Sequence, residues 1–348
     1  MVPLQVSNAQ ATGPTAVSSE PTAEPTFAIA ANVDATPSTS EYARYIHQCI
    51  CSQPSATLLG ALQRSEELAT IPGLTPTLIK NHLLRSTATD KGHIRRHRSN
   101  TASTRNQHKE IEAARSEVDH MFPQHEMQDV FCFASLANII TGTMYTDLTG
   151  AFPVRSFKGM QHIFVAYVYD LNAIIVRAMP SRTDASMVTA FTEVITTFKT
   201  RGYHPALNVM DNECSAAVEN YIRSENISIQ LVPPHNYRVN AAERVIATFK
   251  EHFIAALATA DMHCPLQLWD EFLPQVEVTL NMFCFSLRNP NKSANQEIYG
   301  SFNFTKTPLA PLGTKALVYD DPASRASWAP HATDGYYVGL ASNHYHCL

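Results

Sequence analysis

The sequence has no paired cysteines. Its seven cysteines are scattered along 348 residues, are odd in number and form no C-x-x-C pair. A disulfide framework of the kind that holds small secreted domains together is therefore not indicated. The pattern favours a reducing, intracellular setting.

Long apolar runs are also missing. The first ten residues contain no basic segment followed by an apolar core, which a secretory signal needs. The most apolar stretch, residues 163–176, is interrupted by Asp170 and Asn172. The sequence therefore predicts neither secretion nor insertion into a membrane.

A general excess of positive charge is absent, because 26 lysines and arginines face 31 acidic residues and the net charge is −5. Simple electrostatic binders of nucleic acids are basic, so any contact with DNA must be local. One local basic segment runs from Lys80 to Arg115 and has nine basic residues against three acidic ones. It is either a solvated linker or a DNA-facing arm that includes Arg95, Arg96 and Arg98.

Changes in composition divide the chain into four parts. Residues 1–40 are mostly Ala, Thr, Ser and Pro and are expected to be a disordered tail. Residues 41–115 form a helical and basic segment, residues 138–290 an α/β unit, and residues 300–348 a small β element that is expected to be truncated.

The α/β unit has the clearest pattern. Three segments rich in β-branched and aromatic residues predict consecutive strands, and an alternation of helices and strands follows. This order, β-β-β-α-β-α-β-α, predicts a ribonuclease-H-like mixed five-stranded sheet with flanking helices. The predicted strands are 139–148, 162–170, 173–179, 206–211 and 227–234, and the predicted helices are 183–202, 214–226, 241–260 and 265–285, the last kinked or broken at Pro274.

Three acids stand at the ends of these elements. Asp147 and Asp211 end predicted strands, and Glu243 opens a predicted helix. Taken singly, each has an ordinary explanation, as a turn residue, a helix cap and a first-turn glutamate. Together they offer the oxygen ligands that Mg²⁺ prefers, and two such ions about 4 Å apart can promote an in-line displacement at a phosphodiester.

Lys250 lies seven residues after Glu243 and so on nearly the same face of the predicted helix. A phosphate that passes the carboxylates would meet this ammonium group. The alternative is an ordinary surface lysine with its aliphatic stem on the core.

Several strings in this unit resemble the integrase catalytic core of retroviruses and retrotransposons, in particular a divergent branch of the copia type. The resemblance spans roughly residues 138–348 and rests on the strings YTDLTGAFP, VMDNE, QLVPPHNYRVNAAERVIATFKEHF, PLQLWDEFLPQVEVTLN, TPLAPLGTKALVYD and WAPHATDGYYVG.

The resemblance implies a metal-dependent integrase that processes the 3′ ends of element DNA and joins them to target DNA. Asp147, Asp211 and Glu243 would be the catalytic residues and would bind Mg²⁺ or Mn²⁺, two ions once DNA is bound. Lys250 matches the family's helix lysine near DNA. The resemblance also implies homo-oligomers, a location in the nucleus and no association with a membrane.

The chain departs from the family in two places. Between Asp211 and Glu243 lie 31 residues, fewer than the about 35 usual in the family. The family's zinc module needs paired cysteines, and none follow His93 and His97. The alternative set His47, Cys49, Cys51 and His82 has no usual zinc spacing, so no zinc ligand is predicted.

Two alternatives stay open at this point. The first is a ribonuclease-H-like nuclease, which places an essential acid on the first helix of the unit, where Glu193 is available. The second is a catalytically inactive integrase relic, or a DNA-binding protein that keeps the fold only, because a fold does not guarantee activity.

Overall fold

The computed structural model describes residues 37–94, 142–211, 214–232, 241–319 and 325–339. The predicted tail falls almost wholly outside these ranges, as does the part of the basic arm that carries Arg95, Arg96 and Arg98.

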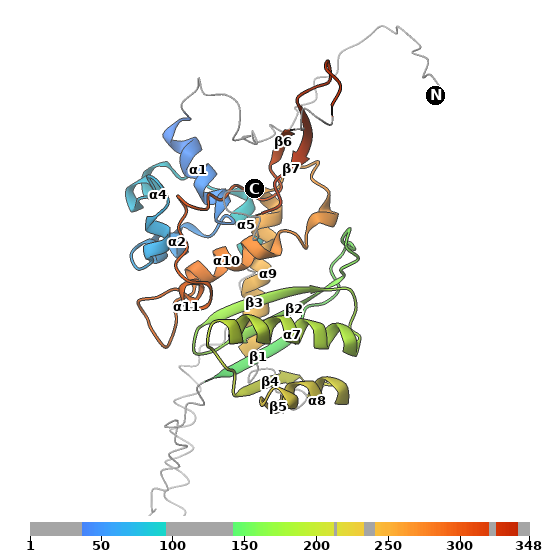
Figure 1. Cartoon of the computed structure of the whole chain (residues 1–348). Helices are drawn as coiled ribbons and strands as arrows, with labels where there is room; N and C mark the ends of the chain where they lie inside the picture. Colours follow the sequence, from blue (N-terminus) through green and yellow to red (C-terminus); the bar gives the residue numbers. More distant parts are fainter. Residues whose placement is uncertain (1–36, 95–141, 212–213, 233–240, 320–324, 340–348) are drawn as a thin grey trace, which may run out of the picture.

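A five-stranded mixed sheet forms the centre of the molecule (Figure 1), with the strand order β3-β2-β1-β4-β5. The first three strands pair antiparallel, whereas β4 and β5 run parallel to β1. This order and these directions confirm the predicted ribonuclease-H-like fold class. The strands are β1 (Thr143–Leu148), β2 (His162–Val168), β3 (Ala173–Met179), β4 (Leu207–Asp211) and β5 (Ser228–Val232).

Helices cover both faces of the sheet. Successive side chains of a strand point to opposite faces, so Phe164 of β2 packs with α7 (Asp184–Thr200) and α8 (Ala216–Ser224), and Val165 packs with α9 (Ala241–Thr259) and α10 (Leu273–Phe283). Because both faces of β2 and β3 are covered by helices, the sequences of these strands are nearly continuous apolar runs. None of the helices in the described ranges is both long and apolar enough to cross a membrane.

The predicted helix over residues 265–285 is divided in the structure. A short 3-10 turn, η1 (Leu266–Leu268), is followed by the fully buried Trp269, and α10 begins only at Leu273. Pro274 therefore lies in the first turn of a new helix, where the missing N–H costs nothing. The predicted break is present, and the proline starts the helix that follows it.

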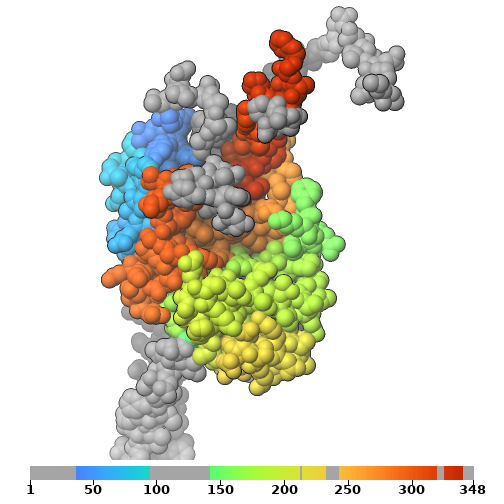
Figure 2. Space-filling model, in the orientation of Figure 1, coloured from blue at the N-terminus to red at the C-terminus, as the bar shows by residue number. Residues whose placement is uncertain are grey.

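The N-terminal helices pack against the back of the α/β unit. They share a third hydrophobic cluster with Met282, Phe304 and Leu309, from segments far along the chain. In Figure 2 the blue helices and the orange segments form one continuous body. The N-terminal helices are α1 (Thr39–Cys49), α2 (Ser55–Leu62), α3 (Glu66–Ala69), α4 (Pro76–His82) and α5 (Thr87–His93). Helix α11 (Ala294–Tyr299) lies later in the chain and packs with the cluster that includes Phe164.

Helices α5 and α9 cross at very short distance. A Cβ atom added to Gly92 of α5 would lie 2.5 Å from the carbonyl oxygen of Glu251 and 2.7 Å from the Cβ of Ala255. Only glycine allows this approach without a shift of one helix. The close contact joins the N-terminal helices to the helix that carries Glu243 and Lys250.

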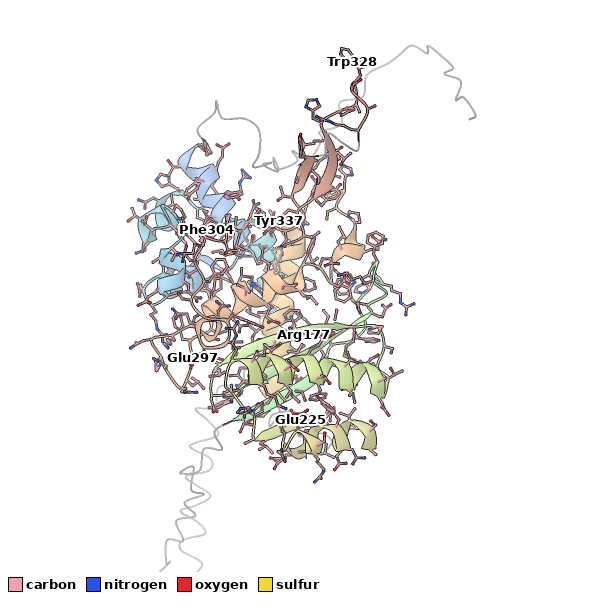
Figure 3. The ribbon with its side chains drawn as sticks, in the orientation of Figure 1. Arg177, Glu225, Glu297, Phe304, Trp328 and Tyr337 are labelled. Atoms are coloured by element: carbon pink, nitrogen blue, oxygen red, sulfur yellow. The ribbon has the colours of Figure 1, made fainter. Side chains whose placement is uncertain are left out.

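The predicted small β element is a two-stranded hairpin of β6 (Lys315–Tyr319) and β7 (Ala332–Tyr336). Tyr337 follows β7 and is buried beneath the hairpin, whereas Trp328 is 99% exposed at its far end (Figure 3). The Tyr337 hydroxyl donates to Gln275 at 2.8 Å, and the Gln275 amide donates to the carbonyls of Cys49 and Ala310. One side chain of α10 thus connects three distant segments.

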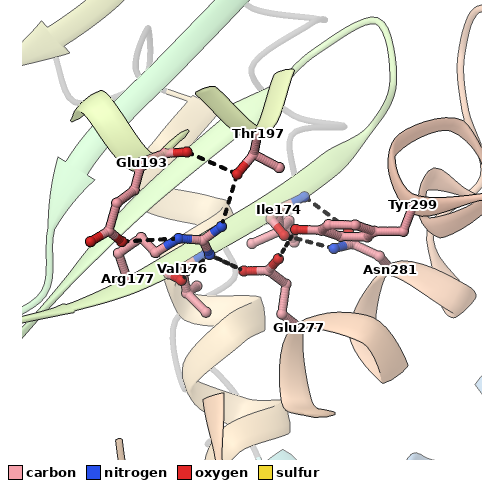
Figure 4. Close-up of polar contacts among 8 residues, drawn as sticks. All are labelled: Ile174, Val176, Arg177, Glu193, Thr197, Glu277, Asn281 and Tyr299. Atoms are coloured by element: carbon pink, nitrogen blue, oxygen red, sulfur yellow. Dashed lines mark hydrogen bonds and ion pairs between the residues drawn. The ribbon is translucent and has the colours of Figure 1, made fainter. Parts of the chain in front are cut away.

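Side chains of α10 complete the outer edge of β3 (Figure 4). The Val176 N–H donates to the Glu277 carboxylate at 2.7 Å, and the Ile174 N–H donates to Asn281 Oδ1 at 2.9 Å. The Asn281 amide donates in return to the Ile174 carbonyl at 2.7 Å. An edge strand that would otherwise present unpaired backbone groups is therefore closed by a helix.

Candidate active site

The ends of β1 and β4 bring two of the predicted acids together. Thr146 and Met210 are partners in the parallel register of these strands, so the next residue on each is Asp147 and Asp211. Tyr145, two residues before Asp147 and on the same face, packs in the cluster under α9. The Asp147 side chain therefore projects from the sheet toward α9.

The other two predicted residues lie on α9. Glu243 is in the first turn and Lys250 lies seven residues later, both exposed. The charges of Asp211, Glu243 and Lys250 all act on the Asp147 carboxyl group. The structure therefore places Asp211, Glu243 and Lys250 within electrostatic reach of Asp147.

The pKa of Asp147 is raised above its ordinary value, chiefly because the carboxyl group is more than half buried. Repulsion by Asp211 and Glu243 raises this pKa further. The Leu148 N–H, which donates to Asp147 Oδ1 at 2.7 Å, lowers it, and so does Lys250. Asp147 thus belongs to a group of carboxylates whose negative charge is incompletely balanced.

Buried polar contacts hold the strand ends in place. The Thr146 hydroxyl, 1% exposed, donates to Asn208 Oδ1 of β4 at 3.1 Å. Beyond Asp147, the Thr149 N–H donates to the Ile163 carbonyl of β2 at 2.9 Å. The backbone around Asp147 is therefore fixed from both neighbouring strands.

A pocket of about 100 Å³ opens beside these acids, where β1 and β4 end between the starts of α7 and α8. Its wall includes Arg182 and Asp184, which the sequence did not single out as site residues. The only signal for them was their place at or just before the start of the helix predicted over residues 183–202. The pocket is lined by Thr146, Asp147, Leu148, Phe164, Arg182, Asp184, Met187, Met210, Asp211, Cys214, Ser215 and Val218.

Within the described ranges, no three His, Cys, Asp or Glu side chains are grouped closely enough to hold a metal ion. Asp147 and Asp211 line one pocket, and the charge of Glu243 acts on Asp147. The chain just before α9, residues 233–240, lies outside the description.

The cysteines considered for zinc serve the packing of the N-terminal helices. The Cys49 thiol donates to the Leu309 carbonyl at 3.3 Å, and the Cys51 thiol lies 3.3 Å from the Thr279 hydroxyl. Burial raises the pKa of the Cys51 thiol to about 12. Zinc binds the thiolate, so a protonated thiol in this interior is a poor ligand.

Glu193, the acid that the nuclease alternative requires, is directed elsewhere. Its carboxylate lies 3.5 Å from the Arg177 guanidinium of β3 (Figure 4). β2 separates β3 from β1, and adjacent strands are about 4.8 Å apart. Glu193 thus pairs with a cation at the far edge of the sheet.

No family model matches the sequence, and no curated protein matches it. Among solved structures, the chain is similar to the catalytic core domain of BIV integrase, with 16% sequence identity and a TM-score of 0.28. The match covers 41% of this chain and 80% of that one. A likeness of this strength does not identify a family.

Proposed function

We propose that this chain is a divalent-metal-dependent polynucleotidyl transferase, an integrase of the copia type that processes DNA 3′ ends and joins them to target DNA. The observation that carries the proposal is the placement of Asp147 and Asp211 at the ends of paired parallel strands. Glu243 and Lys250 act on Asp147 from α9.

The donor chemistry of this site suits Mg²⁺ or Mn²⁺. Carboxylate oxygens are the ligands that such cations prefer, and the repulsion that raises the pKa of Asp147 would be relieved by positive charge. Asp147 and Asp211 would hold the metal, with Glu243 as the third ligand. Two bound ions would supply activation of the attacking hydroxyl and stabilisation of the leaving oxygen.

The chain's own residues position this chemistry. The Leu148 N–H orients one oxygen of Asp147, and the contact between Thr146 and Asn208 holds the two strand ends at a fixed spacing. Lys250, exposed on α9, would bind a phosphate of the DNA backbone near the carboxylates.

The position of Glu193 favours an integrase over a ribonuclease. A nuclease of RNA–DNA hybrids would need this acid near Asp147, whereas it pairs with Arg177 on β3. The inactive relic is the second candidate, since fold and carboxylates together do not establish turnover.

Strand transfer by the purified chain tests the proposal, with a labelled DNA duplex and Mg²⁺ or Mn²⁺. We expect joined products from the wild type and from Asp334→Asn, a control on the exposed hairpin, and none from Asp211→Asn or Glu243→Gln at unchanged melting temperature. Joining by Asp211→Asn at the wild-type level would reject the assignment. A folded, DNA-binding wild type without products would favour the relic, and cleavage of an RNA–DNA hybrid without joining would favour the nuclease.

The remaining expectations, from the resemblance and from the basic segment, stay predictions. They are a homo-oligomer, a location in the nucleus, and a DNA-facing arm. Replacement of Arg95, Arg96 and Arg98 together by alanine should weaken DNA binding and flatten its salt dependence. An unchanged salt slope would identify the segment as a linker.

A further inference from the structure

Arg182 occupies a distinctive place in the pocket beside the carboxylates. It lies in the turn between β3 and α7, and its side chain is exposed. One guanidinium nitrogen, Nη2, donates to the carbonyl oxygen of Thr149 at 3.3 Å, two residues beyond Asp147. This contact directs the side chain of Arg182 toward the end of β1.

The charges in this pocket are unequal. Its lining includes three acidic residues, Asp147, Asp184 and Asp211, and Arg182 is the only lysine or arginine among the described residues that line it. No described carboxylate lies within ion-pair distance of Arg182. Its guanidinium is therefore available to an anionic ligand.

Arg182 and Lys250 approach the carboxylates from different layers. Lys250 acts on Asp147 from α9, whereas Arg182 precedes α7, which covers the opposite face of the sheet. A phosphodiester at the strand ends would meet a cation on each side. Once divalent ions balance the carboxylates, the positive charge of Arg182 adds to the attraction for the phosphate.

We infer that Arg182 is a phosphate-binding residue of this site, which contacts the DNA backbone beside Asp147 from the α7 side. A guanidinium suits this role because it forms paired hydrogen bonds to two oxygens of one phosphate and stays charged at all relevant pH values. The inference rests on the proposed function, in which Glu243 and Lys250 lie on α9 at the opposite side of the strand ends.

The test measures binding of a fluorescent DNA duplex to the full chain in Ca²⁺ at several KCl concentrations. Arg182→Ala should weaken binding about tenfold at low salt and reduce the slope of log K against log salt by about 0.9, the value for one phosphate contact. Arg182→Lys should keep the slope and lose part of the affinity, because lysine retains the charge without the paired geometry. Arg201→Ala, an exposed arginine at the other end of α7, should change neither.

The outcomes separate this inference from the proposed function. Equal affinity and slope for Arg182→Ala and Arg201→Ala would overturn the inference, even if the wild type joins DNA. A slope that depends on Arg182 in a protein that never joins DNA would support the inference and reject the catalytic proposal. A folded wild type that does not bind DNA would reject both.

Discussion

Arg177 of β3 and Glu277 of α10 form an ion pair with an N···O distance of 2.9 Å, in which the glutamate side chain is only 5% exposed. The same carboxylate accepts hydrogen bonds from the Val176 N–H and from the Tyr299 hydroxyl (Figure 4). A buried charge is tolerated when it is paired and fully hydrogen-bonded, and here three donors from two elements, β3 and α11, satisfy it.

Loss of one partner from this pair should be costly. Arg177→Met leaves the buried Glu277 charge without its cation and is expected to lower the free energy of unfolding by about 3–5 kcal/mol. Urea denaturation measures the change. Arg223→Ala breaks the exposed pair with Glu219 and should cost at most about 1 kcal/mol. Similar losses in the two variants would show that the pair at β3 contributes no more than a surface contact.

The space around two helical glycines differs, so their replacement by alanine should have opposite effects on stability. Gly92 lies at the crossing of α5 and α9, and Gly60 lies in α2 away from it. Gly92→Ala forces a methyl group against the Glu251 carbonyl and should destabilise the chain by about 1–3 kcal/mol. Gly60→Ala in α2 meets no atom within 4 Å and should stabilise it by about 0.5–1 kcal/mol. Thermal and chemical denaturation compare the two. A neutral Gly92→Ala would show that the helices separate easily.

His252 of α9 should make the stability fall in mild acid. Burial is the main cause that lowers its pKa to about 3, and the charge of the nearby His93 of α5 contributes to this shift. The ring lies between the Gln53 amide and the Thr279 hydroxyl, which suit a neutral imidazole. Below about pH 6.5 this histidine becomes protonated in the unfolded chain but stays neutral in the folded chain. The free energy of unfolding therefore drops by up to about 1.4 kcal/mol per pH unit.

Denaturation between about pH 6.5 and 5 provides the measurement. His252→Gln removes the titrating group and should flatten the dependence, whatever its effect on stability at neutral pH. His263→Gln replaces an exposed histidine and should leave the slope as in the wild type. Parallel curves for wild type and His252→Gln would contradict the prediction.

The raised pKa of Asp147 predicts a metal-dependent change in stability. The pKa of Asp147 is higher in the folded chain than in the unfolded chain, so the free energy of unfolding falls as the pH rises through the folded-state pKa. At about pH 7 the charged carboxylate therefore destabilises the metal-free chain. Asp147→Asn should stabilise that chain by less than about 1 kcal/mol, because solvent screens the charge. Mg²⁺ should raise the melting temperature of the wild type and have little effect on this variant. Equal Mg²⁺ shifts in both would place the binding elsewhere.

The sequence predicted the sheet and its two strand-end acids well, because both follow from local patterns. Asp147 and Asp211 end apolar runs whose length and residue types indicate strands, and the parallel pairing then brings them together. Arg182 could not be found in this way. Its role depends on the path of the turn before α7 relative to the end of β1, which no local pattern specifies.

The contacts that close the sheet were also beyond the sequence. Glu277 and Asn281 lie in the helix predicted over residues 265–285, and nothing in the sequence indicated that they bind the backbone of β3. Their partners lie more than 100 residues earlier in the chain. Periodicity reports which face of a helix is apolar, and it carries no information on which distant strand a polar side chain will meet.

This closure of β3 by α10 has a consequence for synthesis on the ribosome. Val176 and Glu277 are 101 residues apart, and at roughly 5–20 residues per second the helix is made about 5–20 seconds after the strand. During that interval the nascent sheet presents an open edge, the feature through which chains aggregate. Slow translation between the two segments should therefore lower the yield of native protein, and a chaperone that covers strand edges should restore it.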